Sequence, residues 1–317
     1  MPLSSPLCGV RWPEGCNAVL EKIAIFGVGL IGGSFALALK QAGAVRHVVG
    51  VGRTPAVLER ALQLGIVDQA TTSVAQAVDG ADLILIATPV AQTGAILAAI
   101  APLLQAQTVV TDAGSTKSDV VVAARIALGD RIGQFVPGHP IAGREANGPD
   151  AALADLYVGK KVVLTPLPEN PAASISRVAS AWQQCGAIVH RLSAQQHDRI
   201  FAAVSHLPHL LAYALVDQVD RTPDADLLFQ YAASGFRDFT RIAGSSPEMW
   251  RDIALANRSA LLSEIDAYAA QVARLKGLLM EADGAGLQAL FTNAQRARHA
   301  WLSTIEAAER QTRTGGD

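Results

Sequence analysis

A glycine-rich turn directly after the first apolar segment most constrains what this chain can fold into. The segment "KIAIF" (22–26) leads into "GVGLIGG" (27–33), an Ala/Leu-rich helical stretch follows, and a second apolar segment, "HVVGV", begins at His47. A strand, a glycine turn, a helix and a second strand in this order are typical of a dinucleotide-binding βαβ unit. The pattern G-x-G-x-x-G alone is a weak signal, so a glycine turn without a ligand is the alternative interpretation.

The glycines of this turn have distinct expected roles. Gly27 permits the tight turn, Gly29 lets the backbone approach a pyrophosphate, and Gly32 allows the helix to pack closely on the strand. The helix start offers free N–H groups and a partial positive charge to phosphates. The cofactor-binding residues expected here are Gly27, Gly29, Leu30, Ile31 and Gly32, joined by Thr88 and Pro89 of the later segment "ATPV".

The end of the second apolar segment favours NADP over NAD. An NAD site usually has Asp or Glu there, which accepts a hydrogen bond from the ribose 2′-hydroxyl. This segment ends instead with Gly52, Arg53 and Thr54. A guanidinium and a hydroxyl can bind a 2′-phosphate, which an acid would repel. We therefore expect Arg53 and Thr54 to bind NADP, with NAD as the second option; the alternative is that Arg53 is a solvated loop residue.

The sequence pattern changes near Ser193, which predicts two domains. Before it, short runs rich in Val and Ile alternate with helical segments, and such continuous apolar strands imply a parallel sheet covered on both faces. After it, Ala, Leu and Ile recur at three- and four-residue spacings, as in helices. We predict an α/β Rossmann-type dinucleotide-binding domain (21–193) followed by an all-α domain (194–311), with tails at 1–20 and 312–317. The expected strands are "KIAIF", "HVVGV", "ADLILIA", "TVVTDAG", "GQFVPG", "KVVLTP" and "AIVHRL".

Composition argues against several classes of protein. A net charge of −2 over 317 residues, with 5% aromatic residues, does not fit a nucleic-acid surface, whose footprint would be basic. No secretory signal is visible, and the most apolar region is interrupted by Asp82 and Pro89, so we expect no membrane span and a soluble, cytoplasmic protein. Cys8, Cys16 and Cys185 lack metal-ligand spacing, so we expect no metal site and a reducing compartment.

Two segments at strand ends carry polar residues that packing alone explains poorly. "TDAGSTKSDV" follows an apolar strand, where ligands bind in doubly wound sheets, so Ser115 and Lys117 are expected to face the cofactor crevice or to cap the next helix. In "PGHPIAGREANG", His139 can serve as a general base near neutral pH; a structural histidine is the alternative. Glu145 nearby is expected to orient a partner or to cap a turn.

The segment "HDRIFAAVSHLPHLLAYAL" brings two imidazoles to one helix face. His206 and His209 are three residues apart, and Ser205 precedes them. No third metal ligand is suitably placed, so contact with a polar substrate is favoured over a metal. In "GFRDFTRIAGSSPEMWRDI", the arginines that can clamp a carboxylate are Arg237, Arg241 and Arg251. One or two of these arginines are expected to be ordinary surface charges.

Taken in order, these segments resemble the prephenate/arogenate dehydrogenase family of tyrosine biosynthesis over roughly residues 22–255. The resemblance rests on "GVGLIGGS", "ATPV", "TDAGSTK", "GHPIAGREANG", "LYVGKKVVLTP", "HDRIFAAVSHLPH" and "GFRDFTRIA…MW", of which "GHPIAG" and "SHLPH" are distinctive by themselves. It implies a Rossmann-type domain joined to a helical dimerisation domain that forms a homodimer. A small-molecule substrate would bind between the two domains.

The resemblance also implies a reaction, the NAD(P)-dependent oxidative decarboxylation of prephenate, arogenate or both to 4-hydroxyphenylpyruvate or tyrosine. His139 would accept the proton of the C4 hydroxyl while hydride leaves C4 for the nicotinamide, and Ser115 would hydrogen-bond that hydroxyl or His139. Arg241 matches the arginine that binds the ring carboxylate, and His209 is expected near the side-chain carboxyl group. The further pocket residues implied are Ser205, His206, Glu145 and Trp250.

Two departures and two rival interpretations accompany the resemblance. Many relatives carry an acid near Gly52, so NADP is inferred from Arg53 itself, and Arg144 stands where a small or hydroxyl residue is common. One rival is another two-domain NADP-dependent dehydrogenase, of the β-hydroxyacid dehydrogenase or imine reductase type, which would want a lysine or an acid on the helical side. The other is a non-catalytic NADP-binding dimer, for which His139→Asn would be harmless. Since the chain ends soon after the helical segment, we expect no regulatory domain or fused mutase.

Overall fold

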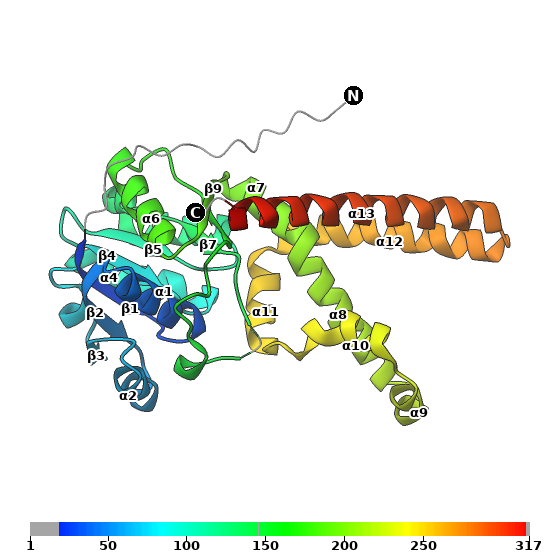
Figure 1. Ribbon diagram of the computed structural model, residues 1–317, viewed down its shortest axis with the longest axis horizontal. Coiled ribbons are helices and arrows are strands. Elements are labelled where there is room, and N and C mark those ends of the chain that lie inside the picture. The colour runs from blue at the N-terminus through cyan, green and yellow to red at the C-terminus, as the bar shows by residue number, and fades with distance from the viewer. Residues whose placement is uncertain (1–18, 145, 315–317) are drawn as a thin grey trace. The chain divides into compact units, whose positions relative to one another are not determined.

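A computed structural model describes residues 19–144 and 146–314 of the chain (Figure 1). The chain divides into two compact units, residues 1–258 and 259–317, a division that falls later than the boundary predicted at Ser193. Most of the predicted N-terminal tail and the whole of Glu145 lie outside the described residues. The expectations for those positions therefore stay predictions.

Six parallel strands form the main sheet of the first unit. They are β1 (Leu20–Phe26), β2 (Val45–Val51), β3 (Gln69–Thr71), β4 (Leu83–Ile86), β5 (Val109–Asp112) and β6 (Phe135–Val136). The strand order β3-β2-β1-β4-β5-β6 is that of the Rossmann fold, so the predicted fold class is confirmed. Strand β3 was not predicted, because its three residues, "QAT", are too few and too polar to form an apolar run.

Alternate side chains of these strands pack against helices on opposite faces of the sheet. Ile23 and Ile25 of β1 share a buried cluster with side chains of α1, α2 and α6, whereas Ala24 and Phe26 share another with α3, α4 and α5. Because both faces are covered, both sets of alternating positions must be apolar, which is why the strands are continuous apolar runs. The helices are α1 (Leu30–Gln41), α2 (Pro55–Gln63), α3 (Val74–Val78), α4 (Thr93–Ile100), α5 (Ser118–Leu128) and α6 (Ala172–Gln184).

The chain leaves the parallel sheet at Pro137, which corrects the expectation that all the apolar strands join one parallel sheet. Strands β7 (Gly138–Pro140), β8 (Lys161–Leu164) and β9 (Ile188–Arg191) form a separate sheet, in which β7 is antiparallel to β8 and β8 is parallel to β9. Pro137 has no N–H and cannot extend the ladder of β6, while its carbonyl accepts a hydrogen bond from Thr165 N at 2.9 Å. The segment "GQFVPG" thus spans two short strands of different sheets.

Helices follow Ser193 in the first unit. Ser193 and Gln196 form a reciprocal capping box at the start of α7. The next turn, η5, is π-helical, and Pro208 in the first turn of α8 has no N–H to donate to the carbonyl four residues earlier, which favours such a widened turn. The run Ala194–Asp220 is long and apolar enough to cross a membrane by length and composition, a test that the core helix of a soluble protein also passes. The elements are α7 (Ala194–Phe201), η5 (Ala202–His206), α8 (Leu207–Asp220), α9 (Ala225–Gln230), α10 (Ser234–Thr240), η6 (Arg241–Gly244) and α11 (Pro247–Ala256).

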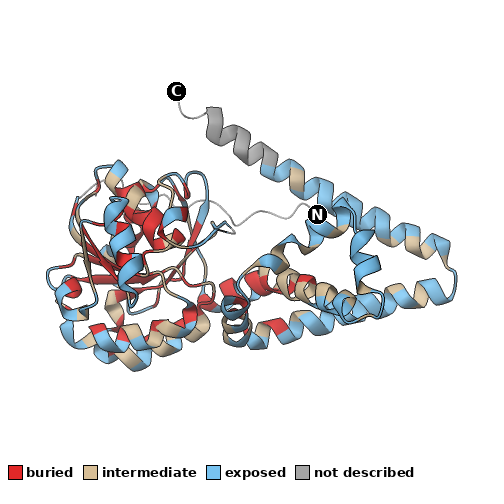
Figure 2. Cartoon of the chain, turned by 90° about the horizontal axis from the view of Figure 1, so that it is seen from below, coloured by how far each residue is buried: buried red, intermediate tan, exposed pale blue. Residues whose placement is uncertain are grey.

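Two long helices, α12 (Arg258–Met280) and α13 (Gly284–Thr314), account for the second unit. The chain reverses between them at a turn in which Ala282 has a φ of 51°. Helix α13 continues past residue 311, where the helical domain was predicted to end. Most residues of both helices whose burial the structure describes are exposed (Figure 2), and the large apolar ones among them are Leu262, Ile265, Tyr268, Val272, Leu279, Met280, Phe291, Trp301 and Ile305.

Candidate active site

A cavity of about 710 Å³ lies at the carboxyl ends of β1, β2 and β4. Its lining includes the turns that follow these strands, at residues 27–29, 52–54 and 87–89, and residues of α4. Successive strands are added on one side of β1 up to β3 and on its other side from β4 onward, and ligands of doubly wound folds bind at such a switch point in strand order. Arg53 is the only charged residue that lines the cavity within the described part of the chain. Of the predicted cofactor residues, those that line it are Gly27, Gly29, Arg53, Thr54, Thr88 and Pro89.

The turn after β1 has no room for side chains at two of its glycines. Gly27 has a φ of +95°, and a Cβ there would lie 2.7 Å from the carbonyl oxygen of Ala87. A Cβ at Gly32 would lie 2.2 Å from the carbonyl oxygen of Gly27. At Gly29, by contrast, the nearest heavy atom to an added Cβ is the Gly148 nitrogen at 4.0 Å. Gly27 and Gly32 thus shape the turn, while Gly29 leaves open space beside the backbone.

The first turn of α1 supplies backbone groups rather than side chains. Leu30 is buried and Ile31 packs against the same core cluster. The Ile31 carbonyl accepts a hydrogen bond from the Tyr157 hydroxyl at 2.6 Å, which ties α1 to the segment before β8. The first N–H groups of any helix have no partner within it, and they carry the positive end of the helix dipole. This end of α1 follows Gly29 directly and is suited to an anionic group.

A buried ion pair fixes the loop after β5. Lys117 and Asp112 are both fully buried and in contact through Nζ and Oδ2. Lys117 Nζ also donates to the carbonyl of Gly138 at 2.8 Å, and Asp112 accepts from the N–H groups of Gly114 at 2.9 Å and Gly138 at 3.0 Å. Lys117 neither faces a crevice nor caps α5 with its side chain, contrary to expectation, because Asp112 binds its ammonium group. The half-buried Ser115 lies in this loop, which the ion pair holds against the start of β7.

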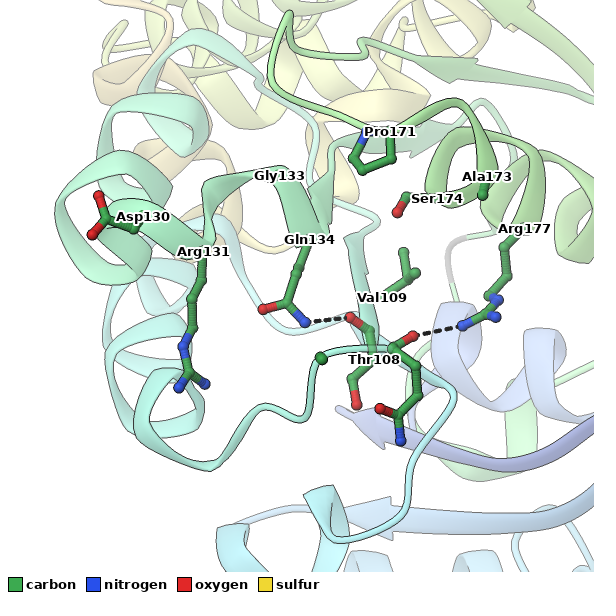
Figure 3. A pocket seen from close by; sticks show the side chains of 12 residues that line it. Thr108, Val109, Asp130, Arg131, Gly133, Gln134, Pro171, Ala173, Ser174 and Arg177 are labelled. Carbon is green, nitrogen blue, oxygen red and sulfur yellow. Dashed lines mark hydrogen bonds between the residues drawn. The ribbon is translucent and has the colours of Figure 1, made fainter.

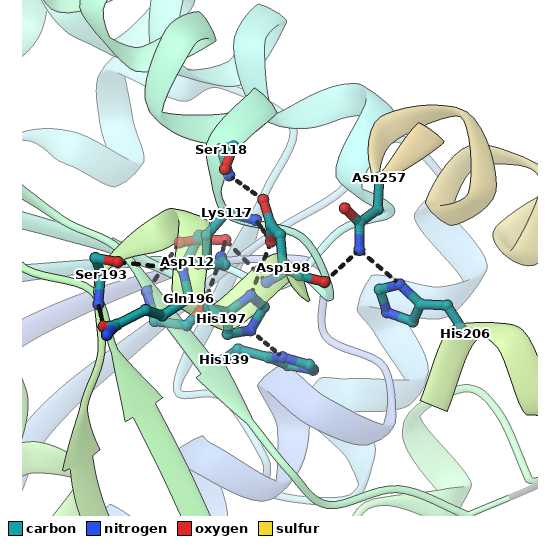
Figure 4. A network of polar contacts seen from close by, with 12 residues as sticks. Asp112, Lys117, Ser118, His139, Ser193, Gln196, His197, Asp198, His206 and Asn257 are labelled. Carbon is teal, nitrogen blue, oxygen red and sulfur yellow. Dashed lines mark hydrogen bonds and ion pairs between the residues drawn. The ribbon is translucent and has the colours of Figure 1, made fainter. Parts of the chain in front are cut away.

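Three side chains beside this loop form a hydrogen-bonded chain (Figure 4). The Nδ1 atom of His139 lies 2.8 Å from Nε2 of His197, and Nδ1 of His197 lies 2.8 Å from Oδ1 of Asp198. Asp198 also accepts from the backbone N–H groups of Lys117 at 2.8 Å and Ser118 at 2.7 Å, at the start of α5. The half-buried His139 on β7 is thereby linked to α7 and α5.

The surroundings favour neutral imidazoles and an ionised Asp198. Burial, followed by the charges of His197, Lys117 and His206, holds the pKa of His139 well below its usual value. Burial also lowers the pKa of His197, against the opposing hydrogen bond to Asp198. Burial acts to raise the pKa of Asp198, but hydrogen bonds from His197, Ser118 and Lys117 outweigh it and leave that pKa lowered.

A second group of predicted residues lies around Trp250. The ring of His209 stacks on that of Trp250 with centroids 3.6 Å apart, and His206 meets it edge-on at 6.0 Å. Nδ1 of His209 donates to the Ser205 carbonyl at 2.9 Å. Arg241 contributes to the lowering of the His209 pKa, of which burial is the main cause, so its guanidinium is near. The structure therefore brings together Ser205, His206, His209, Arg241 and Trp250.

His206 is fixed as a hydrogen-bond donor by Asn257. The Asn257 Nδ2 group lies 3.1 Å from Nδ1 of His206 and donates to the Asp198 carbonyl at 2.8 Å. Burial lowers the pKa of His206 to about 4, so the ring is neutral near pH 7. A neutral ring that accepts at Nδ1 carries its proton on Nε2. His206 can therefore donate to a substrate oxygen.

Sequence reasoning missed several residues of these networks. His197, Asp198 and Asn257 were not singled out, although His197 and Asp198 are both buried here. Helix α7 reads "AQQHDRIF", in which two glutamines precede this pair, so the local sequence gives no signal that the pair is buried. Among the described residues, no group of three or more His, Cys, Asp or Glu side chains is placed to hold a metal ion.

A second cavity, of about 430 Å³, lies beside the starts of β5 and α6 (Figure 3). Its polar side chains are engaged in holding the backbone. Arg131 donates to the carbonyl of Leu104 at 2.6 Å, Gln134 to that of Thr108 at 2.8 Å, and Arg177 to that of Gln107 at 2.7 Å. No predicted site residue lines this cavity, so its arginines serve the fold.

The Rossmann sheet, the cavity at its switch point and the hydrogen-bonded His139 are typical of a dehydrogenase that uses a nicotinamide dinucleotide. The family model described as "Prephenate dehydrogenase, nucleotide-binding domain" matches residues 35–191, and "Prephenate dehydrogenase, dimerization domain" matches residues 193–293. The chain belongs to the prephenate dehydrogenase family. The second match indicates a homodimer.

Several known proteins are similar to this chain along nearly its whole length. Cyclohexadienyl dehydrogenase of Zymomonas mobilis is 38% identical to this chain, over 88% of this chain and 96% of the length of that enzyme. The crystal structure of prephenate dehydrogenase from Aquifex aeolicus in complex with hydroxyphenyl propionate and NAD+ has a TM-score of 0.79 at 35% identity, over 93% of this chain and 99% of that one. Synechocystis arogenate dehydrogenase has a TM-score of 0.75 at 29% identity, over 88% of this chain and 99% of that one.

The family oxidatively decarboxylates prephenate or arogenate with NAD(P), in tyrosine biosynthesis. This chain is accordingly an NAD(P)-dependent oxidoreductase that acts with decarboxylation. Both predictions, of family and of enzyme class, are confirmed.

Proposed function

We propose that His139 accepts the proton of the C4 hydroxyl of prephenate or arogenate, and that Ser115 hydrogen-bonds the same hydroxyl. The observation that carries the proposal is the 2.8 Å hydrogen bond that fixes the His139 imidazole against His197, in surroundings that hold the pKa of His139 well below its usual value. A general base must be unprotonated at the working pH and fixed in position. The contact of Lys117 with the Gly138 carbonyl supports the pairing with Ser115, because it holds the Ser115 loop beside His139.

The proposed proton balance leaves His139 unchanged after each turnover. The C4 hydroxyl proton passes to Nε2 of His139 as hydride leaves C4, and the hydroxyl oxygen becomes a carbonyl oxygen. The bond from C1 to its carboxylate then breaks, CO2 leaves, and the electron pair completes the aromatic ring. The resulting phenolate regains the proton from His139. Aromatisation drives the reaction, so the protein supplies position and charge.

The cavity at the ends of β1, β2 and β4 fits a dinucleotide, and we assign it to NADP with NAD as the second option. The first turn of α1 and the open space at Gly29 suit a pyrophosphate. The buried hydroxyl of Thr88 has no hydrogen-bond partner among the described residues and can bind the cofactor. Arg53 favours a 2′-phosphate, and no carboxylate accompanies it among the described residues that line the cavity. When bound, the nicotinamide ring accepts the hydride.

The residues around Trp250 are proposed to bind the substrate. Arg241 would bind the ring carboxylate through two parallel hydrogen bonds, and the Nε2–H of His206 would donate to a second polar group. A neutral His209 donates from Nδ1 to the Ser205 carbonyl and has only a lone pair at Nε2. Its proposed contact with the side-chain carboxyl group therefore requires the protonated ring. We also propose that Glu145 is one of the residues that line the substrate pocket.

The homodimer is proposed to form through the exposed apolar side chains of α12 and α13. Large exposed apolar areas on soluble proteins mark surfaces that a partner covers, and here they include Leu279, Met280 and Trp301. We also propose that the boundary between the two functional domains lies at Ser193 and that the protein is cytoplasmic.

A four-way assay tests the proposed function. Purified protein is mixed with prephenate or arogenate and with NADP+ or NAD+, and reduced cofactor and released CO2 are measured together. We expect equal amounts of both products and a higher kcat/KM with NADP+. Absence of reduction with both substrates would overturn the proposal, and a preference for NAD+ would overturn the cofactor assignment alone.

A further inference from the structure

We infer that His197 and Asp198 are positioning residues for the proposed base, because together they fix His139 as the tautomer with its proton on Nδ1. The inference rests on the proposed role of His139 and adds the source of its basic nitrogen. It follows from the direction of three consecutive hydrogen bonds, each of 2.8 Å, that run from Lys117 N to Asp198, from His197 to Asp198, and between the two histidines.

The direction of the chain is set at Asp198. Both carboxylate oxygens face backbone N–H groups, Oδ1 that of Lys117 and Oδ2 that of Ser118. An N–H can only donate, so these contacts require acceptor oxygens and favour the ionised carboxylate. The location at the start of α5, where the helix dipole is positive, favours the same charge. Asp198 is therefore an acceptor toward His197.

The proton positions follow one after another from that acceptor. His197 must donate from Nδ1 to Asp198, and because the ring is neutral its Nε2 carries a lone pair. His139 must then donate from Nδ1 to that lone pair, which leaves its own Nε2 unprotonated. The reverse arrangement, with His197 donating from Nε2, would need a proton on both nitrogens of a fully buried ring. Only the first arrangement leaves His139 able to accept a proton at Nε2.

The same chain stabilises His139 after it has accepted the proton. The charges and titratable groups that face it are His197, Lys117 and His206, and the Lys117 charge is paired with Asp112. The ionised Asp198 is linked to His139 through two hydrogen bonds. It favours the imidazolium that forms during the reaction without accepting the proton itself.

A purely structural role for His197 is the competing explanation. Its ring is fully buried and packs on Phe201 with centroids 4.5 Å apart and on His139 at 5.0 Å. Under that explanation a leucine of similar volume would serve as well as glutamine. Under the positioning role, the amide oxygen of glutamine can still accept from His139, whereas leucine cannot. The pair His197→Gln and His197→Leu therefore separates the two explanations.

Imidazole nitrogen shifts measured by NMR test the tautomer directly. Protein labelled with ¹⁵N-histidine is compared with His139→Asn to assign the His139 signals. We expect Nδ1 of His139 to be protonated and Nε2 unprotonated in the wild type, and the two forms to mix in Asp198→Asn. Protonation on Nε2 in the wild type would overturn the inference regardless of how any variant folds.

Steady-state kinetics give the second readout. We expect Asp198→Asn and His197→Leu to lower kcat by about 10²–10⁴-fold, with KM changed by less than about threefold. His197→Gln should keep at least about tenfold more activity than His197→Leu, and Asp198→Asn should move the acidic limb of the kcat/KM profile to lower pH. The control is His47→Asn, a histidine on β2 outside these networks, which should leave kcat unchanged.

The outcomes separate this inference from the proposed function. Wild-type turnover in His139→Asn would overturn the role of His139 itself. Loss of turnover in His139→Asn together with equal activity in His197→Leu and His197→Gln would overturn the inference and leave the proposed function standing.

Discussion

The Nδ1 atom of His139 lies 2.8 Å from the Nε2 atom of His197, although 58 positions separate the two residues in the chain. His139 is on β7 of the small sheet and His197 is on α7, so the contact joins the sheet domain to the first helix that follows it. The loop after β5 completes the arrangement, because Lys117 bonds both the Gly138 carbonyl and Asp198. A site assembled from three elements depends on the packing of each.

Replacing Gly27 with alanine should damage the cofactor site. The new Cβ would lie 2.7 Å from the Ala87 carbonyl oxygen at a residue with a φ of +95°, so the turn must shift. We expect dinucleotide affinity, measured by fluorescence titration with NADPH, to fall by at least about tenfold, equivalent to about 1.4 kcal/mol. Gly43→Ala is the matched control, with a φ of +64° and no heavy atom within 4 Å. It should lose about 1 kcal/mol of stability and no affinity; equal losses of affinity would refute the steric argument.

Replacing Arg53 with aspartate should reverse the cofactor preference. The substitution removes the one charge that lines the cavity in the described part of the chain and places an acid near the position where an NAD site has one. We expect the ratio of kcat/KM for NADP+ to that for NAD+ to fall by about 100-fold, the loss of one charged hydrogen bond plus repulsion. Arg46→Asp, at the other end of β2 in an exposed ion pair with Glu21, should leave the ratio unchanged. An unaltered ratio in Arg53→Asp would contradict the NADP assignment.

Replacing Arg241 with lysine should weaken substrate binding more than turnover. Lysine keeps the charge but cannot make two parallel hydrogen bonds to a carboxylate. We expect KM to rise by about 10–100-fold and kcat to fall by less than about threefold. Arg221→Lys, on an exposed arginine paired with Asp217, is the control. If KM stays the same in Arg241→Lys, the ring carboxylate binds elsewhere.

Stability should fall between pH 7 and pH 5, partly through His206. Its pKa is about 4 when folded and about 6.5 when unfolded, so the unfolded chain binds more protons in this window. The free energy of unfolding that depends on a neutral His206 is therefore present above pH 6.5 and is lost as the pH falls toward 4. The loss between pH 7 and pH 5 is about 2 kcal/mol. Urea denaturation of the wild type and His206→Asn at both values measures it. The variant should show a pH dependence smaller by that amount; an identical dependence would mean that folding does not lower the pKa of His206.

The main sheet was predictable because its signals are local. "KIAIF" and "GVGLIGG" are adjacent, and each residue type there has one steric or packing reason that the structure bears out at Gly27 and Gly32. The sheet that a strand joins, by contrast, depends on residues far away in the sequence. Pro137 diverts the chain between β6 and β7, and β7 then pairs with β8, more than twenty residues further on. The pattern of apolar residues alone therefore does not determine which sheet β7 joins.

The structure brings together several residues that the sequence singled out one by one, but the hydrogen-bonded network beside them was not predicted. His139 was singled out by its strand-end position, whereas its partner His197 lies in a helix where a His-Asp pair ordinarily faces solvent. Burial of both His197 and Asp198 follows from the packing of α7 against the loop after β5, which no periodicity encodes. The expectation that Lys117 faces the crevice or caps a helix was wrong, because its ammonium group binds Asp112, five residues earlier across a loop. The sequence alone does not show that this loop brings the two side chains together.

The most direct measurement of the central claim is the turnover of His139→Asn. Asparagine keeps a polar side chain of similar size but cannot accept and return a proton near neutral pH. With prephenate or arogenate and saturating NADP+, we predict a kcat lower than that of the wild type by about 10²–10⁴-fold, with cofactor affinity unchanged and His47→Asn fully active. A kcat for His139→Asn equal to that of the wild type would contradict the account.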